Sequence, residues 1–104
     1  MASLIKRPIV IQDLIDHATY ISLDNLDAGD RFLYAAEDTF QQIAKFPGIG
    51  RLSGFTTPAI ANVRQYRIKG FNRYIIFYQS HSDMVEIIRV LHGAQNLEFI
   101  LEQE

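Results

Sequence analysis

The sequence predicts an α+β fold in which an N-terminal strand and a two-helix hairpin pack on a small antiparallel β-sheet. Two observations carry this prediction. Between residues 9 and 45, apolar side chains recur at spacings of three and four, the period of an amphipathic helix. Between residues 63 and 91, short runs rich in β-branched and aromatic residues alternate with turn-forming residues, which indicates hairpins. The expected element order is β-α-α-β-β-β with a short C-terminal helix.

The N-terminal half is predicted to contain a short strand and two helices. Residues 3–7 form the strand, which Pro8 closes. A first helix begins at Ile9 and fades between residues 23 and 25, and Asp27 is the expected N-cap of the second. The second helix ends by Lys45, because a residue before proline avoids the helical region and Pro47 follows Phe46. Its apolar stripe is Phe32, Ala36, Phe40 and Ile43.

The C-terminal half is predicted to contain three strands and a short helix. The strands cover residues 63–69, 74–79 and 84–91, with turns at residues 70–72 and 81–83. The middle run is aromatic and β-branched and apolar on both faces, which is typical of a central strand covered on both sides. Leu97, Ile100 and Leu101 indicate the closing helix.

Composition bounds the class of protein. The chain has 104 residues, 48% of them hydrophobic and 21% charged, which suits a single globular domain over residues 1–104. It has no cysteine, so disulfides and thiolate chemistry are excluded, and its three histidines lack the spacing of metal ligands. No apolar run is long enough for a membrane span, and the N-terminus lacks the layout of a secretory signal. We therefore expect a cytoplasmic protein with no cofactor, no metal and no membrane partner.

The charges are strongly segregated along the chain. Residues 39–82 contain no aspartate or glutamate but six cations, so this segment carries +6 while the whole chain carries −2. Such segregation predicts one electropositive face. A face of this kind suits a phosphate backbone or an acidic protein segment. The six cations are Lys45, Arg51, Arg64, Arg67, Lys69 and Arg73.

Four motifs in a fixed order resemble a known family. They are Asp13-Leu14-Ile15-x-His17-x-x-Tyr20-Ile21, Phe46-Pro47-x-x-Gly50-Arg51, Arg67 ahead of Gly70-Phe71-x-x-Tyr74-x-Ile76-Phe77-Tyr78, and Ile87-x-Arg89-Val90-Leu91-His92-Gly93-Ala94. Together they resemble the RelE/ParE superfamily of toxins from bacterial type II toxin–antitoxin systems, and within it the ParE-like branch. The resemblance runs over residues 4–101.

The resemblance implies two alternative functions. A ParE-like protein inhibits growth by binding DNA gyrase, without chemistry of its own. A RelE-like protein is instead a metal-independent endoribonuclease that cuts ribosome-bound mRNA. Either would be neutralised by a cognate antitoxin, a ParD-like or other small protein. The antitoxin could dock by adding a strand to a sheet edge or by placing a helix in a groove beside the helical hairpin.

The candidate site residues follow from charge and from the motifs. Arginine and lysine suit phosphates and carboxylates, so the candidate target-binding residues are Arg51, Arg64, Arg67, Lys69 and Arg89. Under the ribonuclease alternative, His92 would transfer a proton while Arg89 and Arg67 would hold the charge that grows on the phosphate.

The environment of Arg89 leaves two possibilities open. It lies in an apolar run, where an unpartnered guanidinium is costly. It is therefore either paired with a carboxylate, for which Asp13, Asp16 and Glu86 are candidates by charge, or exposed on the open face of the sheet. The functional hypothesis expects the cations to gather on that open face.

Overall fold

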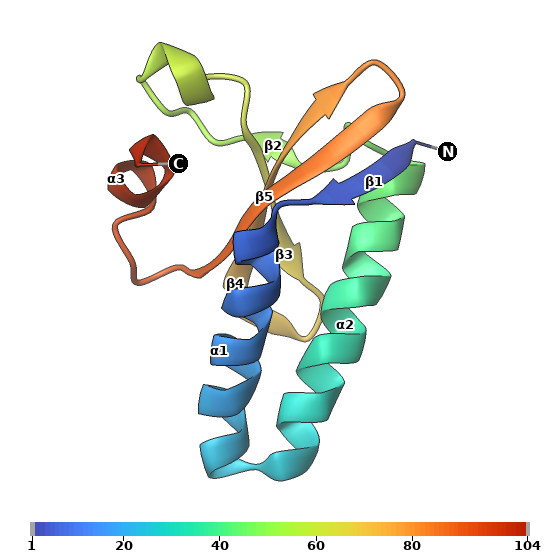
Figure 1. Cartoon of the computed structure of the whole chain (residues 1–104), viewed down its shortest axis with the longest axis vertical. Coiled ribbons are helices and arrows are strands. Elements are labelled where there is room, and N and C mark those ends of the chain that lie inside the picture. The colour runs from blue at the N-terminus through green and yellow to red at the C-terminus, as the bar shows by residue number, and fades with distance from the viewer. Residues whose placement is uncertain (1, 104) are drawn as a thin grey trace.

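The structure, a computed structural model, describes residues 2–103 and has the expected α+β architecture (Figure 1). A helical hairpin covers one face of a five-stranded sheet whose order is β1-β5-β4-β3-β2. The elements are β1 (Ser3–Lys6), α1 (Pro8–Asp24), α2 (Leu26–Lys45), β2 (Arg51–Leu52), the short 3-10 helix η1 (Pro58–Ile60), β3 (Arg64–Ile68), β4 (Phe71–His81), β5 (Met84–His92) and α3 (Leu97–Glu102).

The sheet is mixed and not wholly antiparallel. β3, β4 and β5 form the expected antiparallel meander, but β1 lies beside β5 and runs parallel to it. Parallel neighbours need a long connection, and the whole chain between these two strands supplies it. The two-residue strand β2, which extends the opposite edge, was not expected from the sequence.

The helices match their expected ranges, but the N-cap of α2 differs. Asn25 alone joins the two helices, and its side-chain oxygen accepts a hydrogen bond from the Ala28 amide at 3.2 Å. The predicted cap, Asp27, is wrong, because α2 begins two residues earlier and places this carboxylate in its first turn. There it still faces the positive end of the helix dipole. α2 ends at Lys45, as Pro47 requires.

A close approach between the helices explains a glycine in α2. A Cβ atom built on Gly29 would lie only 2.9 Å from the carbonyl oxygen of Ala18 in α1, which is closer than packed atoms come. The hairpin then directs the apolar stripe of α2 onto the sheet, and all four predicted members of that stripe are fully buried.

Both faces of the central strand are buried, as expected. Tyr74, Ile76 and Tyr78 of β4 pack towards the helices, while Ile75 and Phe77 pack on the second face. This second face is covered by the segment of residues 53–63 and by α3, which lie together on the side away from α2 (Figure 1). The expectation of an open sheet face is therefore wrong, because apolar side chains fill it.

Both hairpin turns are tighter than expected. The β3–β4 turn is Lys69 and Gly70, with Gly70 at φ +83°, so β4 begins at Phe71. The β4–β5 turn is Ser82 and Asp83, with Ser82 at φ +55°. One left-handed residue in each turn lets two residues reverse the chain, so β4 extends beyond its predicted range.

Candidate target-binding cleft

Three of the predicted cations line one cleft between α2 and the β2–β3 edge of the sheet. The cleft has a volume of about 620 Å³. Its cations are Arg51, Arg67 and Lys69. The remaining lining consists of Gln42, Ile49, Gln65, Tyr66 and Asn72. No acidic side chain is among them, so the charge segregation in the sequence is realised as a concave basic surface.

The cleft cations have no carboxylate partner within residues 2–103. Arg67 donates from Nη1 to the carbonyl oxygen of Asn72 at 2.5 Å, which holds its side chain over the β3–β4 turn. Arg51 makes only a long contact of 3.4 Å to the carbonyl of Leu52. Since neither contact neutralises charge, the cleft presents positive charge to solvent.

A buried tyrosine fixes the turn that carries Arg51 to the cleft. The Tyr78 hydroxyl donates to the carbonyl of Pro47 at 2.8 Å and accepts from the Gly50 amide at 2.9 Å. Burial raises the pKa of Tyr78, so the hydroxyl stays protonated and able to donate. A Cβ atom on Gly50 would lie 2.7 Å from the carbonyl oxygen of Gln65. The glycine of this motif is therefore required by packing, while Pro47 contributes its backbone carbonyl as an acceptor.

Arg64 serves the same turn and does not line the cleft. Its Nη1 donates to the carbonyl of Gly50 at 2.6 Å, and the residue is partly buried. Both backbone polar groups of Gly50 are thus satisfied by side chains from β3 and β4. The structure gives this predicted target-binding residue a supporting position behind Arg51.

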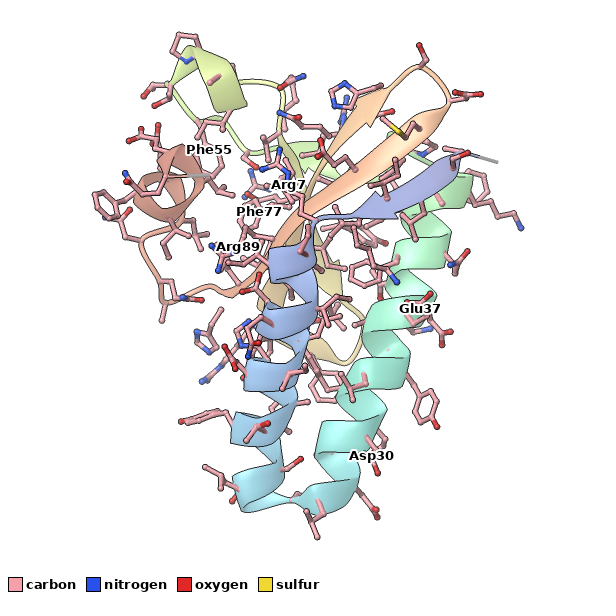
Figure 2. The ribbon with its side chains drawn as sticks, in the orientation of Figure 1. Arg7, Asp30, Glu37, Phe55, Phe77 and Arg89 are labelled. Carbon is pink, nitrogen blue, oxygen red and sulfur yellow. The ribbon has the colours of Figure 1, made fainter. Side chains whose placement is uncertain are left out.

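Arg89 is held against α1 by an ion pair with Asp13. Its Nε and Nη2 donate to the two carboxylate oxygens of Asp13, each at 2.8 Å, and the two side chains are 13% and 9% exposed. Figure 2 shows Arg89 beside the first turns of α1. Of the two possibilities that the sequence left open, the structure has the paired one. Glu86 pairs instead with Arg7.

The first turns of α1 also provide hydrogen-bond partners for the edge of β5. β1 pairs with β5 only as far as Ile87, so the next part of β5 has β4 on one side and no strand on the other among the described residues. There the Val90 amide donates to Asp13 at 3.0 Å, and the Val90 carbonyl is 2.8 Å from Nε2 of His17, which must donate to it. Asp13 and His17 are one helical turn apart, so one face of α1 satisfies this edge.

His92 takes part in a local turn at the end of β5. Its Nδ1 accepts a hydrogen bond from the Ala94 amide at 3.1 Å, and its ring packs edge-on against Tyr74 with centroids 5.1 Å apart. Neither His92 nor Arg89 lines the cleft that holds Arg67. The three residues named for the ribonuclease alternative are therefore not brought together in that cleft.

One carboxylate links the two parts that cover the second sheet face, the segment of residues 53–63 and α3. Glu98 of α3 accepts hydrogen bonds from the amide and hydroxyl groups of Thr56 and Thr57. Partial desolvation acts to raise the pKa of Glu98, but these hydrogen bonds outweigh it and the pKa lies below its ordinary value. Below the cover, Phe55 stacks on Phe77 with centroids 6.0 Å apart (Figure 2).

Charge-based reasoning missed the neutral residues of the cleft. Gln42, Gln65 and Asn72 carry no charge, and only the fold brings α2 next to β3. Tyr66 was assigned to a strand but to no site. Alternation along the strand places Tyr66 on the face opposite Arg67, so the sequence gives no signal that both residues line one cleft.

Comparison with known proteins agrees with the fold. The family model described as the ParE toxin of the type II toxin–antitoxin system parDE matches residues 4–97. The chain belongs to this family. A solved structure described as the chromosomal ParDE toxin–antitoxin system from P. aeruginosa is similar, with a TM-score of 0.61 and 16% identity. The match covers 88% of this chain and 96% of that one. No curated protein matches in sequence.

Two further features of this ParE-family toxin concern residues 2–103. No helix in this range has the length and apolar character needed to cross a bilayer. Nor do three or more histidine, aspartate or glutamate side chains gather there in a way that could hold a metal ion. The α3 helix begins at Leu97, where the family match ends.

Proposed function

We propose that this ParE-family toxin inhibits growth by binding DNA gyrase through its basic cleft. The observation that supports this is the gathering of Arg51, Arg67 and Lys69 in one concave surface without a carboxylate partner among the described residues. Exposed cations that gather in one concave surface and are not neutralised internally favour a partner of opposite charge. Since gyrase acts in the cytoplasm, the toxin would act there as well.

The cleft supports binding better than catalysis. No histidine, aspartate or glutamate lines it, so the lining groups that could exchange a proton are the ammonium of Lys69 and the hydroxyl of Tyr66. The ribonuclease alternative requires His92 and Arg89 beside Arg67, and these two side chains are engaged with Ala94 and Asp13. No contact in the structure favours that alternative.

The cognate antitoxin that a ParDE system implies would cover the same region. β2 pairs only with Arg64 and Gln65 of β3. The rest of β3, residues 66–68, has no outer strand partner in the part of the chain that the structure describes. An extended segment can add to such an edge through main-chain hydrogen bonds. We infer that an acidic segment of the antitoxin pairs there and neutralises the cleft.

A gyrase supercoiling assay tests the proposal. We expect the purified toxin to inhibit supercoiling and the variant Arg51→Gln/Lys69→Gln to lose most of that inhibition. Neither side chain holds the fold by a short hydrogen bond, so the variant should unfold at the same urea concentration as the parent. Arg31→Gln is the matched control, because Arg31 is an exposed cation of α2 outside the cleft.

Two outcomes would refute the proposal that the toxin binds gyrase through its cleft. One is a wild-type toxin that leaves supercoiling unchanged but cleaves mRNA on ribosomes. The other is a double variant that inhibits gyrase as strongly as the wild type. The first outcome would establish the enzymatic alternative, and the second would move the gyrase contact away from the cleft.

A further inference from the structure

We propose that the basic cleft binds a single nucleic-acid strand, with phosphates on its cations and a base on Tyr66. The inference rests on the proposed function, since it names a ligand for the same three cations. It concerns direct binding of nucleic acid by the toxin alone, which can be measured without gyrase. The cleft would hold the strand without cutting it.

The cations of the cleft differ from those that the fold pairs with carboxylates. Lys6, Arg7 and Arg89 are each paired with a carboxylate, at 2.9, 2.9 and 2.8 Å. The cations of the cleft have no such partner among residues 2–103, although twelve acidic residues are available in the chain. Unneutralised arginine and lysine side chains in a groove are the electrostatic signature of a phosphate backbone.

The neutral lining is what favours a nucleic acid over an acidic peptide. Three amide side chains, those of Gln42, Gln65 and Asn72, border the cleft. None of these amide groups is hydrogen-bonded to another side chain within the described residues. Amides both donate and accept, which matches the edges of bases, whereas a row of carboxylates requires donors only.

Tyr66 supplies the remaining element of strand recognition. It is half-buried in the wall of the cleft, between two polar neighbours of β3. Base stacking on an aromatic side chain is tolerant of sequence and requires an unpaired base. The cleft volume of about 620 Å³ fits a ligand of one or two nucleotides, within the range of ordinary ligand pockets.

Fluorescence anisotropy with the full chain tests the inference. The probe is a fluorescein-labelled oligothymidylate of about eight nucleotides, and oligouridylate of equal length is the second arm. We expect saturable binding. The logarithm of the association constant should fall linearly with the logarithm of the salt concentration, with a slope near −2, because each of three phosphate contacts contributes about 0.7. Tighter binding of either oligomer supports the proposal, and oligodeoxyuridylate, which differs from oligouridylate only in its sugar, shows which sugar the cleft prefers.

Variants of the cleft separate phosphate contacts from base stacking. Arg51→Gln/Lys69→Gln should weaken binding at least tenfold and lower the salt slope by about 1.4, because two phosphate contacts are lost. Tyr66→Leu should weaken binding about tenfold while leaving the slope unchanged, since stacking involves no counterion. Arg31→Gln should bind like the wild type. Urea unfolding midpoints confirm that each variant is folded.

Three results would overturn the inference. The first is equal binding of a duplex of the same sequence, because its bases cannot stack on Tyr66. The second is displacement of the oligomer by hexaglutamate at the same concentration as by unlabelled oligothymidylate. The third is equal binding by the cleft variants and the Arg31→Gln control. A toxin that inhibits gyrase but binds no oligomer would refute this inference alone.

Discussion

Replacing Asp13 with asparagine should destabilise the protein by about 3 kcal/mol, because Arg89 then lacks its counter-charge. The carboxylate accepts three hydrogen bonds at 2.8, 2.8 and 3.0 Å, from Nε and Nη2 of Arg89 and from the Val90 amide. Removing one partner of a buried ion pair typically costs about 3–5 kcal/mol. The lower figure applies because both side chains keep some exposure, 9% and 13%.

Urea unfolding followed by circular dichroism measures this loss. With a slope of about 1–3 kcal/mol per molar, the midpoint should fall by roughly 1–3 M while the slope stays constant. Asp16→Asn is the matched control, since Asp16 is exposed in the same helix and, among residues 2–103, accepts a hydrogen bond only from Gln12. It should change stability by less than about 0.5 kcal/mol.

The double variant Asp13→Leu/Arg89→Met tests whether charge is the cause. Replacing both members of a buried ion pair with apolar groups is often close to neutral, so it should recover part of the loss. The Val90 amide still lacks an acceptor, which retains a cost of about 1–3 kcal/mol. The reasoning fails if Asp13→Asn costs no more than its Asp16 control, or if the double variant is less stable than the single one.

Three further changes probe the remaining structural contacts. Tyr78→Phe should lower the free energy of unfolding in urea by about 1–3 kcal/mol, since the buried Gly50 amide loses its acceptor. An unchanged midpoint would contradict this. Gly29→Ala should lower the melting temperature despite the better helix propensity of alanine, because the methyl group would lie 2.9 Å from the Ala18 carbonyl. A higher melting temperature would disprove that contact. Glu98→Gln should speed amide exchange in α3 at neutral pH, and wild-type α3 should loosen as pH falls below about 4.5, since a carboxyl whose pKa is lowered by folding loses its contribution on protonation. Exchange that is independent of pH between 3 and 7, after correction for intrinsic rates, would exclude this role.

The helical half of the fold could be predicted well because its signals are local. The stripe of α2 and the stop before Pro47 depend on spacing and on backbone sterics within a few residues. The choice of N-cap was wrong because Asn25 and Asp27 are both good caps, and only the tight one-residue join between the helices selects the first.

The sheet and the cleft were harder because they depend on contacts between distant residues. Nothing in residues 3–6 reveals that they lie parallel to β5, since strand direction is set by the path of the whole chain. For Arg89 the sequence named the right partner, Asp13, among three, because opposite charge limits the choice without fixing geometry. The amide side chains of the cleft could not be predicted as site residues, because the sequence marked the site only by its positive charge.

Most of the motif residues that identify the family hold the fold together. Asp13, His17 and Arg89 close the edge of β5, and Gly50 with Pro47 encloses the Tyr78 hydroxyl. Among the cleft residues, the motifs contain only the two arginines.

It follows that the motif residues and the cleft that we propose binds the target overlap only at Arg51 and Arg67. Substitutions at the β5 edge should therefore change stability and leave the affinity of the folded protein intact. Substitutions of Lys69 or Gln65 should do the reverse, because these side chains border the cleft and have no ion-pair partner among the described residues. Measuring unfolding and binding on both sets of variants would separate the two roles. A variant such as Lys69→Gln that lost stability and affinity together would show that the cleft is part of the structural framework.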